Sequence, residues 1–481
     1  MLTAKQEMQP SEYSRLYDVL VPESHFLRKF KNLVDFSFIY DELKDAYCAF
    51  FGRVAEDPVR MFKHLILKDL YNLSDRGLVH RAHTDLAFKF FLDLAPEADV
   101  IDSTTLCHFR KERIKTAEFL DLLISKSMEI AFREGVIKSR TVIIDATHTR
   151  AAYNLKTPIE ILRERSKNLR KKMYAVDSEC KSLLPEKYLG EEITQEIEYT
   201  KNLIAVLDTQ TMAELPAIAE ARELVLESLD EDAMKAQSLG DANARKGYKS
   251  SELLFLGYKE NIIIVDERII CGAVVTPGNT ADGNYMLELV AKAKANGVTI
   301  ETILADSAYS GKAHINFANE NDIKLVSKLN PIITGEYRET NFTLNKDSGR
   351  FICPAGHEAI RKARTGKRNV KKNQCETHYF DIDICKNCPL REGCYTAGAK
   401  SKTHSVSIKT PNQVDQIAFQ NSEEFKLLAR DRYKIEAINA ELKNIHGLKN
   451  CKSDGLFGMT LQTATTIFVV NIKRILKLMA E

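Results

Sequence analysis

Residues 1–135 carry the hydrophobic spacing of helices. In D-P-V-R-M-F-K-H-L-I-L-K-D-L-Y, apolar residues recur at helical intervals after Pro58, which suits a first helical turn. A second helical pattern ends near Leu94. In I-D-S-T-T-L-C-H-F-R-K-E-R-I, either Asp102 or Ser103 can cap a further short helix. The N-terminal region is therefore predicted to be all-helical.

The last of these helices is basic. We expect it to expose four positions: His108, Arg110, Lys111 and Arg113. A helix, a turn and a basic second helix form a shape that binds DNA. The alternative is a small helical bundle with a solvated basic face. We predict a DNA-binding domain over residues 1–135, with Arg110, Lys111 and Arg113 as contacts.

Farther along, the pattern becomes that of strands. Residues 141–145 (T-V-I-I-D) form a β-branched run, and residues 252–275 contain two such runs around a turn at 266–268, which predicts a hairpin. V-T-I-E-T-I-L-A-D and I-K-L-V-S-K-L are two more strands. A helix is expected from about Tyr285 to Ala295, with Thr280 or Asp282 as its cap. The order of three strands, helix, strand, helix and strand is that of a ribonuclease-H-like mixed sheet, so the fold class is α/β.

Two segments interrupt this core. Residues 151–244 begin with a capping box (Thr157, Pro158, Glu160) and continue with apolar residues at seven-residue spacing, which predicts a helical hairpin or short coiled coil. Residues 331–419 are polar and contain glycines and cysteines. The core is then expected to comprise residues 136–150, 245–330 and 420–481.

Composition narrows the class of protein. Hydrophobic residues make up 44% of the 481 residues and charged residues 28%, as in an ordinary soluble globular protein. The net charge is only +2, so any surface for nucleic acid must be local. The N-terminal segment lacks the pattern of a secretory signal. The most apolar stretch, residues 461–470, is short and is predicted to be a buried helix, not a membrane span. We expect a cytoplasmic protein.

Two acids close apolar strands. Asp145 ends V-I-I-D, and Asp306 ends I-L-A-D. Neighbouring strands bring their ends close together, and two adjacent carboxylates repel each other unless a cation lies between them. Glu436 lies in the helical segment R-Y-K-I-E-A-I-N-A-E-L-K. Such a set of acids can hold two Mg²⁺ or Mn²⁺ ions for phosphodiester chemistry. The alternative is that each Asp forms a turn or caps a helix.

A cysteine cluster lies in the second insertion. Cys353 is followed by Cys385, Cys388 and Cys394 in C-K-N-C-P-L-R-E-G-C, a spacing typical of a structural zinc site. The alternative is a set of unrelated thiols; Cys375, His357 and His378 are spare ligand candidates. Residues 361–372 contain seven basic residues and no acid. We predict DNA-backbone contacts there, with a solvated loop as the alternative. The predicted contacts are Arg361, Lys362, Arg364, Lys367 and Arg368.

These motifs together resemble the DDE transposases of bacterial insertion sequences. The resemblance rests on V-I-I-D-A-T-H-T, V-V-T-P-G-N-T-A-D, I-L-A-D-S-A-Y-S-G-K and the segment around Glu436, and it looks closest to a subgroup with a helical and a cysteine-rich insert. The family signature Tyr-x2-Arg-x3-Glu-x6-Lys is matched by Arg432, Glu436 and Lys443, whereas Ala429 stands at the Tyr position.

The resemblance implies a DNA transposase with a ribonuclease-H-like core. It assigns Asp145, Asp306 and Glu436 as catalytic metal ligands, and Arg432 and Lys443 as phosphate or DNA-end contacts. The expected activity is cleavage of the element's ends and their transfer to target DNA by a homodimer on DNA. We also predict Lys312 as a phosphate contact, because it lies at a predicted helix start and the N-termini of helices favour anions. A catalytically inactive DNA-binding relic and a simple ribonuclease-H-like nuclease remain the alternatives.

Overall fold

A mixed β-sheet forms the centre of the computed structural model, which describes residues 2, 11–48, 54–116, 118–151, 157–229, 241–248, 254–330, 341–366 and 373–481. Its six strands among these residues are β1 (Thr141–Arg150), β2 (Arg245–Tyr248), β3 (Leu254–Val265), β4 (Ile270–Pro277), β5 (Thr302–Ala305) and β6 (Lys324–Ser327). β3 runs antiparallel to β1 and β4, and β5 runs parallel to β1 and β6. The predicted hairpin at 266–268 and the mixed sheet are confirmed.

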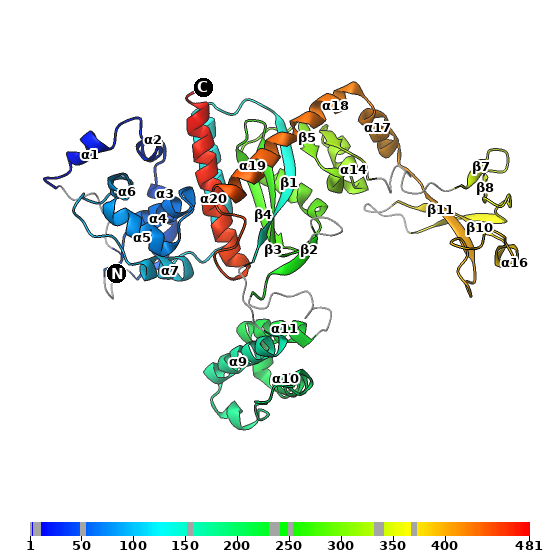
Figure 1. Cartoon of the computed structure of the whole chain (residues 1–481), viewed down its shortest axis with the longest axis horizontal. Helices are drawn as coiled ribbons and strands as arrows, with labels where there is room; N and C mark the ends of the chain where they lie inside the picture. The colour runs from blue at the N-terminus through cyan, green and yellow to red at the C-terminus, as the bar shows by residue number, and fades with distance from the viewer. Residues whose placement is uncertain are drawn as a thin grey trace.

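Short helices connect the later strands of the sheet, and a further series of helices ends the chain. The crossovers between β4 and β6 are formed by η4 (Asp282–Tyr285), α13 (Met286–Ala295), η5 (Ser307–Tyr309) and α14 (Lys312–Glu320). The chain ends with α17 (Pro411–Gln420), α18 (Glu423–Ala429), η6 (Arg430–Arg432), α19 (Tyr433–Asn444) and α20 (Gly455–Leu478). In Figure 1, α19 and α20 lie beside the sheet.

The C-terminal helix α20 is a core element. Among the described residues it alone is long and apolar enough to cross a membrane, but 72% of its apolar window is buried inside the protein. Asn471, fully buried on α20, accepts a hydrogen bond from the Ile270 N–H (2.8 Å) and donates to the Ile270 carbonyl and to Ser127 Oγ (2.8 Å each). The predicted burial of residues 461–470 is confirmed, and one amide ties α20 to the sheet.

The N-terminal region is helical, as predicted. Its elements are α1 (Leu16–Leu20), α2 (Phe26–Leu33), α3 (Ser37–Leu43), η1 (Lys44–Ala46), α4 (Pro58–Leu70), α5 (Asp75–Thr84), α6 (Leu86–Phe91), α7 (Ser103–Glu112) and α8 (Phe119–Arg133). Pro58 opens α4, and the Asp102 side chain caps α7. Phe30 and Phe62 pack edge to face against Phe468 of α20. The N-terminal helices therefore share one hydrophobic cluster with the sheet.

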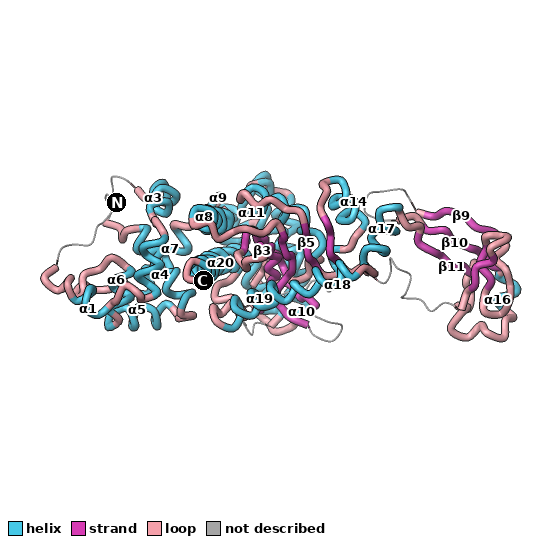
Figure 2. Tube along the Cα trace, turned by 90° about the horizontal axis from the view of Figure 1, so that it is seen from above, coloured by secondary structure: helices cyan, strands magenta, loops and turns pink. Residues whose placement is uncertain are grey.

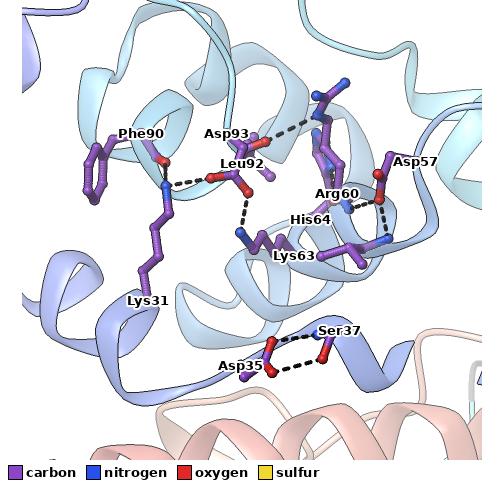
Figure 3. Close-up of polar contacts among 11 residues, drawn as sticks. Lys31, Asp35, Ser37, Asp57, Arg60, Lys63, His64, Phe90, Leu92 and Asp93 are labelled. Carbon is purple, nitrogen blue, oxygen red and sulfur yellow. Dashed lines mark hydrogen bonds and ion pairs between the residues drawn. The ribbon is translucent and has the colours of Figure 1, made fainter. Parts of the chain in front are cut away.

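Several basic side chains of this region bind internal partners. Figure 3 shows Lys31 and Lys63 converging on Asp93, with a Lys31 Nζ to Asp93 Oδ1 distance of 2.5 Å. Arg60 Nε donates to the Leu92 carbonyl at 3.2 Å. These contacts hold α2 and α4 to the turn after α6, so the three cations stabilise the fold.

The first insertion has its own small core. It contains α9 (Pro158–Val176), η2 (Glu179–Ser182), α10 (Ile193–Asp208), η3 (Thr211–Glu214) and α11 (Pro216–Leu229). The predicted capping box of Thr157 and Glu160 is present. The expected hairpin or coiled coil is wrong for the described residues, because α9 packs against both α10 and α11 around a separate hydrophobic cluster. Val176 and Leu183, two of the apolar residues in the repeating pattern after Glu160 that predicted the coiled coil, are exposed.

The second insertion is built from short strands. They are β7 (Thr343–Asn345), β8 (Arg350–Ile352), β9 (Arg361–Thr365), β10 (Cys375–Phe380) and β11 (Lys402–Ser407), with α16 (Ile382–Lys386) between the last two. The sheet order is β11-β10-β9. In Figure 2 this part and the N-terminal helices lie at opposite ends of an elongated molecule, with the central sheet between them.

Candidate active site

Two predicted acids lie side by side on the central sheet. β1 and β5 are parallel, and Ile144 pairs with Ala305 as the last residues in register. The next residue of each chain segment is Asp145 or Asp306, so both carboxylates lie at the same edge of the sheet. Asp306 also caps the turn after β5, because its Oδ1 accepts a hydrogen bond from the Ala308 N–H at 2.8 Å. β1 continues five residues beyond Asp145, farther than the sequence pattern predicted.

Helix α19 contributes the third side of the site. Asn439 Nδ2 donates to Asp145 Oδ2 at 3.1 Å. Glu436 precedes Asn439 by three residues on the same helix and is exposed. Residues three apart on a helix share a face. The segment that follows α19 is attached to the end of β1, where the Arg150 N–H donates to the Lys449 carbonyl at 3.1 Å.

The electrostatics of the site favour cation binding. Burial raises the pKa of Asp145 to about 6; the Arg432 charge opposes this shift and the Asp306 charge adds to it. Burial also raises the pKa of Asp306, against the opposing effects of the Ala308 N–H and Arg432. Two partly buried carboxylates that repel each other are stabilised in their charged form by a positive ion. Arg432, just before α19, supplies part of that charge.

Three buried polar atoms around these acids lack hydrogen-bond partners in the described part of the chain. They are Tyr309 Oη, Asn439 Oδ1 and Arg432 Nε. Buried polar atoms almost always have a partner, so such a group points to a missing ligand, water or ion. Tyr309 is 1% exposed, and the charges of Asp282, Asp145 and Asp306 all raise the pKa of its phenol, after burial. The residues present therefore fit a site for a cation and a phosphate.

The acids are not assembled into a complete ligand set. Among the described residues, no three His, Cys, Asp or Glu side chains lie close enough together to hold a metal ion. Asp145 and Asp306 are neighbours, while Glu436 points to solvent from the adjacent helix. Oxygen ligands of this kind suit Mg²⁺ or Mn²⁺.

Two predicted phosphate contacts border the acids. Lys443 Nζ lies 3.4 Å from His148 Nδ1, which places it beside β1. Lys312 is the first residue of α14, the helix that follows Asp306 and η5. Glu441 is the other acid on α19 besides Glu436, and it accepts a hydrogen bond from Lys473 Nζ at 2.7 Å. Its hydrogen bonds with His446 and Lys473 lower its pKa to about 2. That acid serves an ion pair outside the site.

The predicted basic face of α7 needs correction. Lys111 and His108 are exposed as expected. Arg110 is half-buried and forms a two-pronged pair with Asp75, at 3.0 and 2.5 Å. Arg113 donates to the Ala46 carbonyl at 2.7 Å. The expectation of exposure is therefore wrong for both arginines, because tertiary contacts with earlier helices hold them.

The basic segment 361–372 is only partly described. Arg361, Lys362 and Arg364 lie on β9, the outer strand of its sheet, and all three are exposed. Arg361 stacks on Tyr379, with its guanidinium 3.6 Å from the ring centre. The predicted contacts Lys367 and Arg368 lie outside the described residues.

The four predicted zinc ligands lie around one cavity, although their side chains are not close enough together to form a metal site. Cys353, Cys385, Cys388 and Cys394 line one cavity of about 150 Å³. His357 also lines it, whereas the spare candidates Cys375 and His378 do not. The Leu390 N–H donates to Cys388 Sγ at 3.4 Å. The pKa of Cys385 is raised by burial and by the thiols of the other three.

Sequence reasoning missed two residues of the site. Asn439 could have been found because it follows Glu436 by nearly one helical turn. Thr280 or Asp282 was expected to cap α13, and this is wrong, because Tyr285 stands at the cap position without a side-chain cap bond. The Asp282 carboxylate instead accepts a hydrogen bond from Lys259 Nζ at 2.7 Å. No local signal marks that pair, because the two residues lie on different elements.

Comparison with known families gives two matches. Residues 15–112 match a transposase domain (DUF772), and residues 223–472, more than half of the chain, match the transposase DDE domain. The second match spans Asp306, Arg432, Glu436 and Lys443, and begins after Asp145. No curated protein matches the chain.

Proposed function

The chain belongs to the transposase DDE domain family and is a DNA transposase, and from that premise we propose how it acts. It cuts the ends of an insertion element and joins them to target DNA, with Asp145, Asp306 and Glu436 holding two divalent ions. Members of this family use Mg²⁺ or Mn²⁺, and the family implies a ribonuclease-H-like core. The observation that carries the proposal is the group of unpartnered polar atoms beside Asp145 and Asp306.

The metal site requires one adjustment of the helix side chains. Asn439 already contacts Asp145, and Glu436 shares its face of α19. A change of side-chain rotamer therefore turns Glu436 toward the two aspartates without moving the backbone. When bound, the ions supply Lewis-acid activation of the attacking oxygen and neutralise charge on the scissile phosphate.

Protein residues orient the DNA around that centre. Arg432 Nε has a free N–H next to the acids and donates to a non-bridging phosphate oxygen. Lys443 and Lys312 approach the phosphates on either side, one from beside β1 and one from the start of α14. Asn439 holds the Asp145 carboxylate in one orientation. Positioning and charge neutralisation are thus the work of the protein.

Residues farther from the acids are proposed to bind the DNA at the ends of the element. We infer that Lys111 on α7 and the β9 residues Arg361, Lys362 and Arg364 meet the DNA backbone, because all four are exposed. Arg110 and Arg113 shape that helix by their internal pairs. Two ends must be joined in one event, which favours a homodimer on DNA. The protein is expected to work in the cytoplasm, on the DNA of the nucleoid.

The test is a nicking and strand-transfer assay on a labelled duplex that carries the element's own ends. Wild type should cut and join the ends in Mg²⁺ or Mn²⁺, whereas Asp145→Asn, Asp306→Asn and Glu436→Gln should do neither. Asp208→Asn is the matched control, because Asp208 forms an ion pair with Arg222 inside the first insertion. Binding without cutting supports the relic alternative, and cutting without joining supports a simple nuclease. Activity that survives Glu436→Gln moves the third ligand elsewhere.

We also propose that the cysteine cavity holds a structural Zn²⁺. Four thiols at one cavity, with a backbone N–H directed at one sulfur, suit tetrahedral sulfur ligation. Short strands with little apolar core gain stability from such a bond. Metal analysis should find one zinc per chain in wild type and in Cys375→Ser, and none in Cys385→Ser. Equal zinc in both variants would refute the assignment.

A further inference from the structure

The loop after β4 brings a fourth carboxylate to the acids. Asp282 opens η4, and Lys259 of β3 donates to it at 2.7 Å and to the Thr280 carbonyl at 2.9 Å. Lys259 is 13% exposed and Asp282 28% exposed at their side chains. Within β3, Lys259 pairs with His148 of β1, three residues after Asp145. The ion pair therefore lies beside the catalytic strand.

The same loop is fixed against the turn that follows Asp306. Thr276 and Thr280 share a hydrogen bond at 2.7 Å, which closes the loop. A side chain at Gly283 would place its Cβ 2.5 Å from the Ala308 carbonyl oxygen, so only glycine permits this approach. η4 thus packs directly on η5. Asp282, next to Gly283, is held at the side of Asp306 by backbone packing.

A buried hydroxyl lies within this cluster of acids. Tyr309 is 1% exposed, and its Oη has no partner among the described residues. The negative charges of Asp282, Asp145 and Asp306 all raise the pKa of its phenol, and after burial the charge of Asp282 has the largest effect. A hydroxyl that is buried among carboxylates yet bonded to none of them leaves room for a bridging water or ion.

We propose that Asp282 is a fourth acidic residue that holds a divalent ion at this site, and that Lys259 is its counter-ion until the ion binds. The inference rests on the proposed function. Three carboxylates and two cations, Lys259 and Arg432, leave this group with a net negative charge before Glu436 is added. A divalent ion competes with the Lys259 ammonium for the Asp282 oxygens, since both are held by the same charge.

This arrangement predicts opposite effects from the two partners of one ion pair. Asp282→Asn removes a ligand charge and should weaken Mn²⁺ binding about 10- to 100-fold, the range seen when groups supporting a metal site are lost. Lys259→Met removes the competing cation, so it should leave Mn²⁺ binding unchanged or make it tighter. If the pair were only structural, both substitutions would act alike and neither would change Mn²⁺ affinity.

The experiment is a Mn²⁺ titration of the full chain without DNA, followed by electron paramagnetic resonance of the free ion. Asp145→Asn is included to test the proposed function itself, and Asp208→Asn, which loses an ion pair with Arg222 in the first insertion, is the control for an ion-paired aspartate outside the site. If Asp145→Asn weakens binding and Asp282→Asn does not, this inference is overturned while the proposed function stands. If Asp145→Asn has no effect, the proposed site itself is wrong. Weaker binding in Lys259→Met, equal to that in Asp282→Asn, would also overturn it.

Discussion

Glu260 on β3 is a buried acid whose removal should stabilise the protein. Its side chain is fully buried, and neither carboxylate oxygen has a hydrogen-bond partner among the described residues. Burial raises its pKa from 4.5 to about 8. The opposing effects of the nearby Thr149 hydroxyl and of Lys443 are smaller, and that hydroxyl donates its hydrogen to the Leu448 carbonyl. At neutral pH the folded protein therefore keeps this proton, whereas the unfolded chain loses it.

The pH dependence follows from proton linkage. Between pH 4.5 and 8 the folded state binds about one more proton at Glu260 than the unfolded state, so the free energy of unfolding falls as pH rises. Each pH unit is worth about 1.4 kcal/mol for one group. The accumulated cost is about 1 kcal/mol at pH 5 and about 3 kcal/mol at pH 7, and it is fully developed near pH 8.

Glu260→Gln keeps the shape of the side chain and removes the titration. We expect the free energy of unfolding of this variant to exceed that of wild type by about 3 kcal/mol at pH 7, with a smaller gain at pH 5. Urea unfolding followed by circular dichroism at several pH values measures this, since the chain has no Trp for fluorescence. The slope of stability against pH between 5 and 8 should flatten in the variant.

Glu441→Gln is the matched control with the opposite sign. The pKa of Glu441 is lowered to about 2 by its hydrogen bonds with His446 and Lys473, so its stabilisation is present above pH 4.5 and lost as pH falls toward 2. That variant should be less stable than wild type at pH 7. Should Glu260→Gln also lower stability at pH 7, Glu260 is ionised and paired with Lys443, and the argument from burial fails.

Three further predictions concern single side chains. Asn471→Leu leaves the backbone N–H and carbonyl of Ile270 unpaired and should cost about 3 kcal/mol of unfolding free energy, measured by urea unfolding. Asn439→Ala frees the Asp145 carboxylate and should slow DNA cleavage about 5- to 10-fold at saturating DNA, with DNA affinity unchanged. Because the pKa of Asp145 is raised to about 6, Mn²⁺ affinity of the free protein should fall by up to about tenfold per pH unit below 6 and level off above it.

Each of these has a result that contradicts it. Loss of less than about 0.5 kcal/mol in Asn471→Leu would mean that water replaces the amide. Reduced DNA affinity in Asn439→Ala at an unchanged cleavage rate would make Asn439 a DNA contact instead of a positioning residue. Mn²⁺ affinity that does not vary between pH 5 and 7 would show that Asp145 is ionised throughout this range.

The sequence alone determined the local elements of this protein. Strand runs such as 141–145 and helix starts at Pro58 and Thr157 depend on neighbouring residues, and each appears where the pattern predicted it. The proximity of Asp145 and Asp306 also followed from sequence, because the ends of adjacent parallel strands meet at one edge of the sheet. The transposase family was predictable because its motifs recur in order along the chain.

Only the tertiary structure decided which charged groups meet. The Asp75–Arg110 pair and the Lys259–Asp282 pair each join separate elements, so no spacing along the chain reveals them. The contact of Phe468 with Phe30 and Phe62 joins the last helix to the first ones. Hydrophobic periodicity identifies the buried face of an element but carries no information about its partner. That is why the helical and strand pattern could be predicted, whereas the place of Asp282 at the candidate site emerged only from packing.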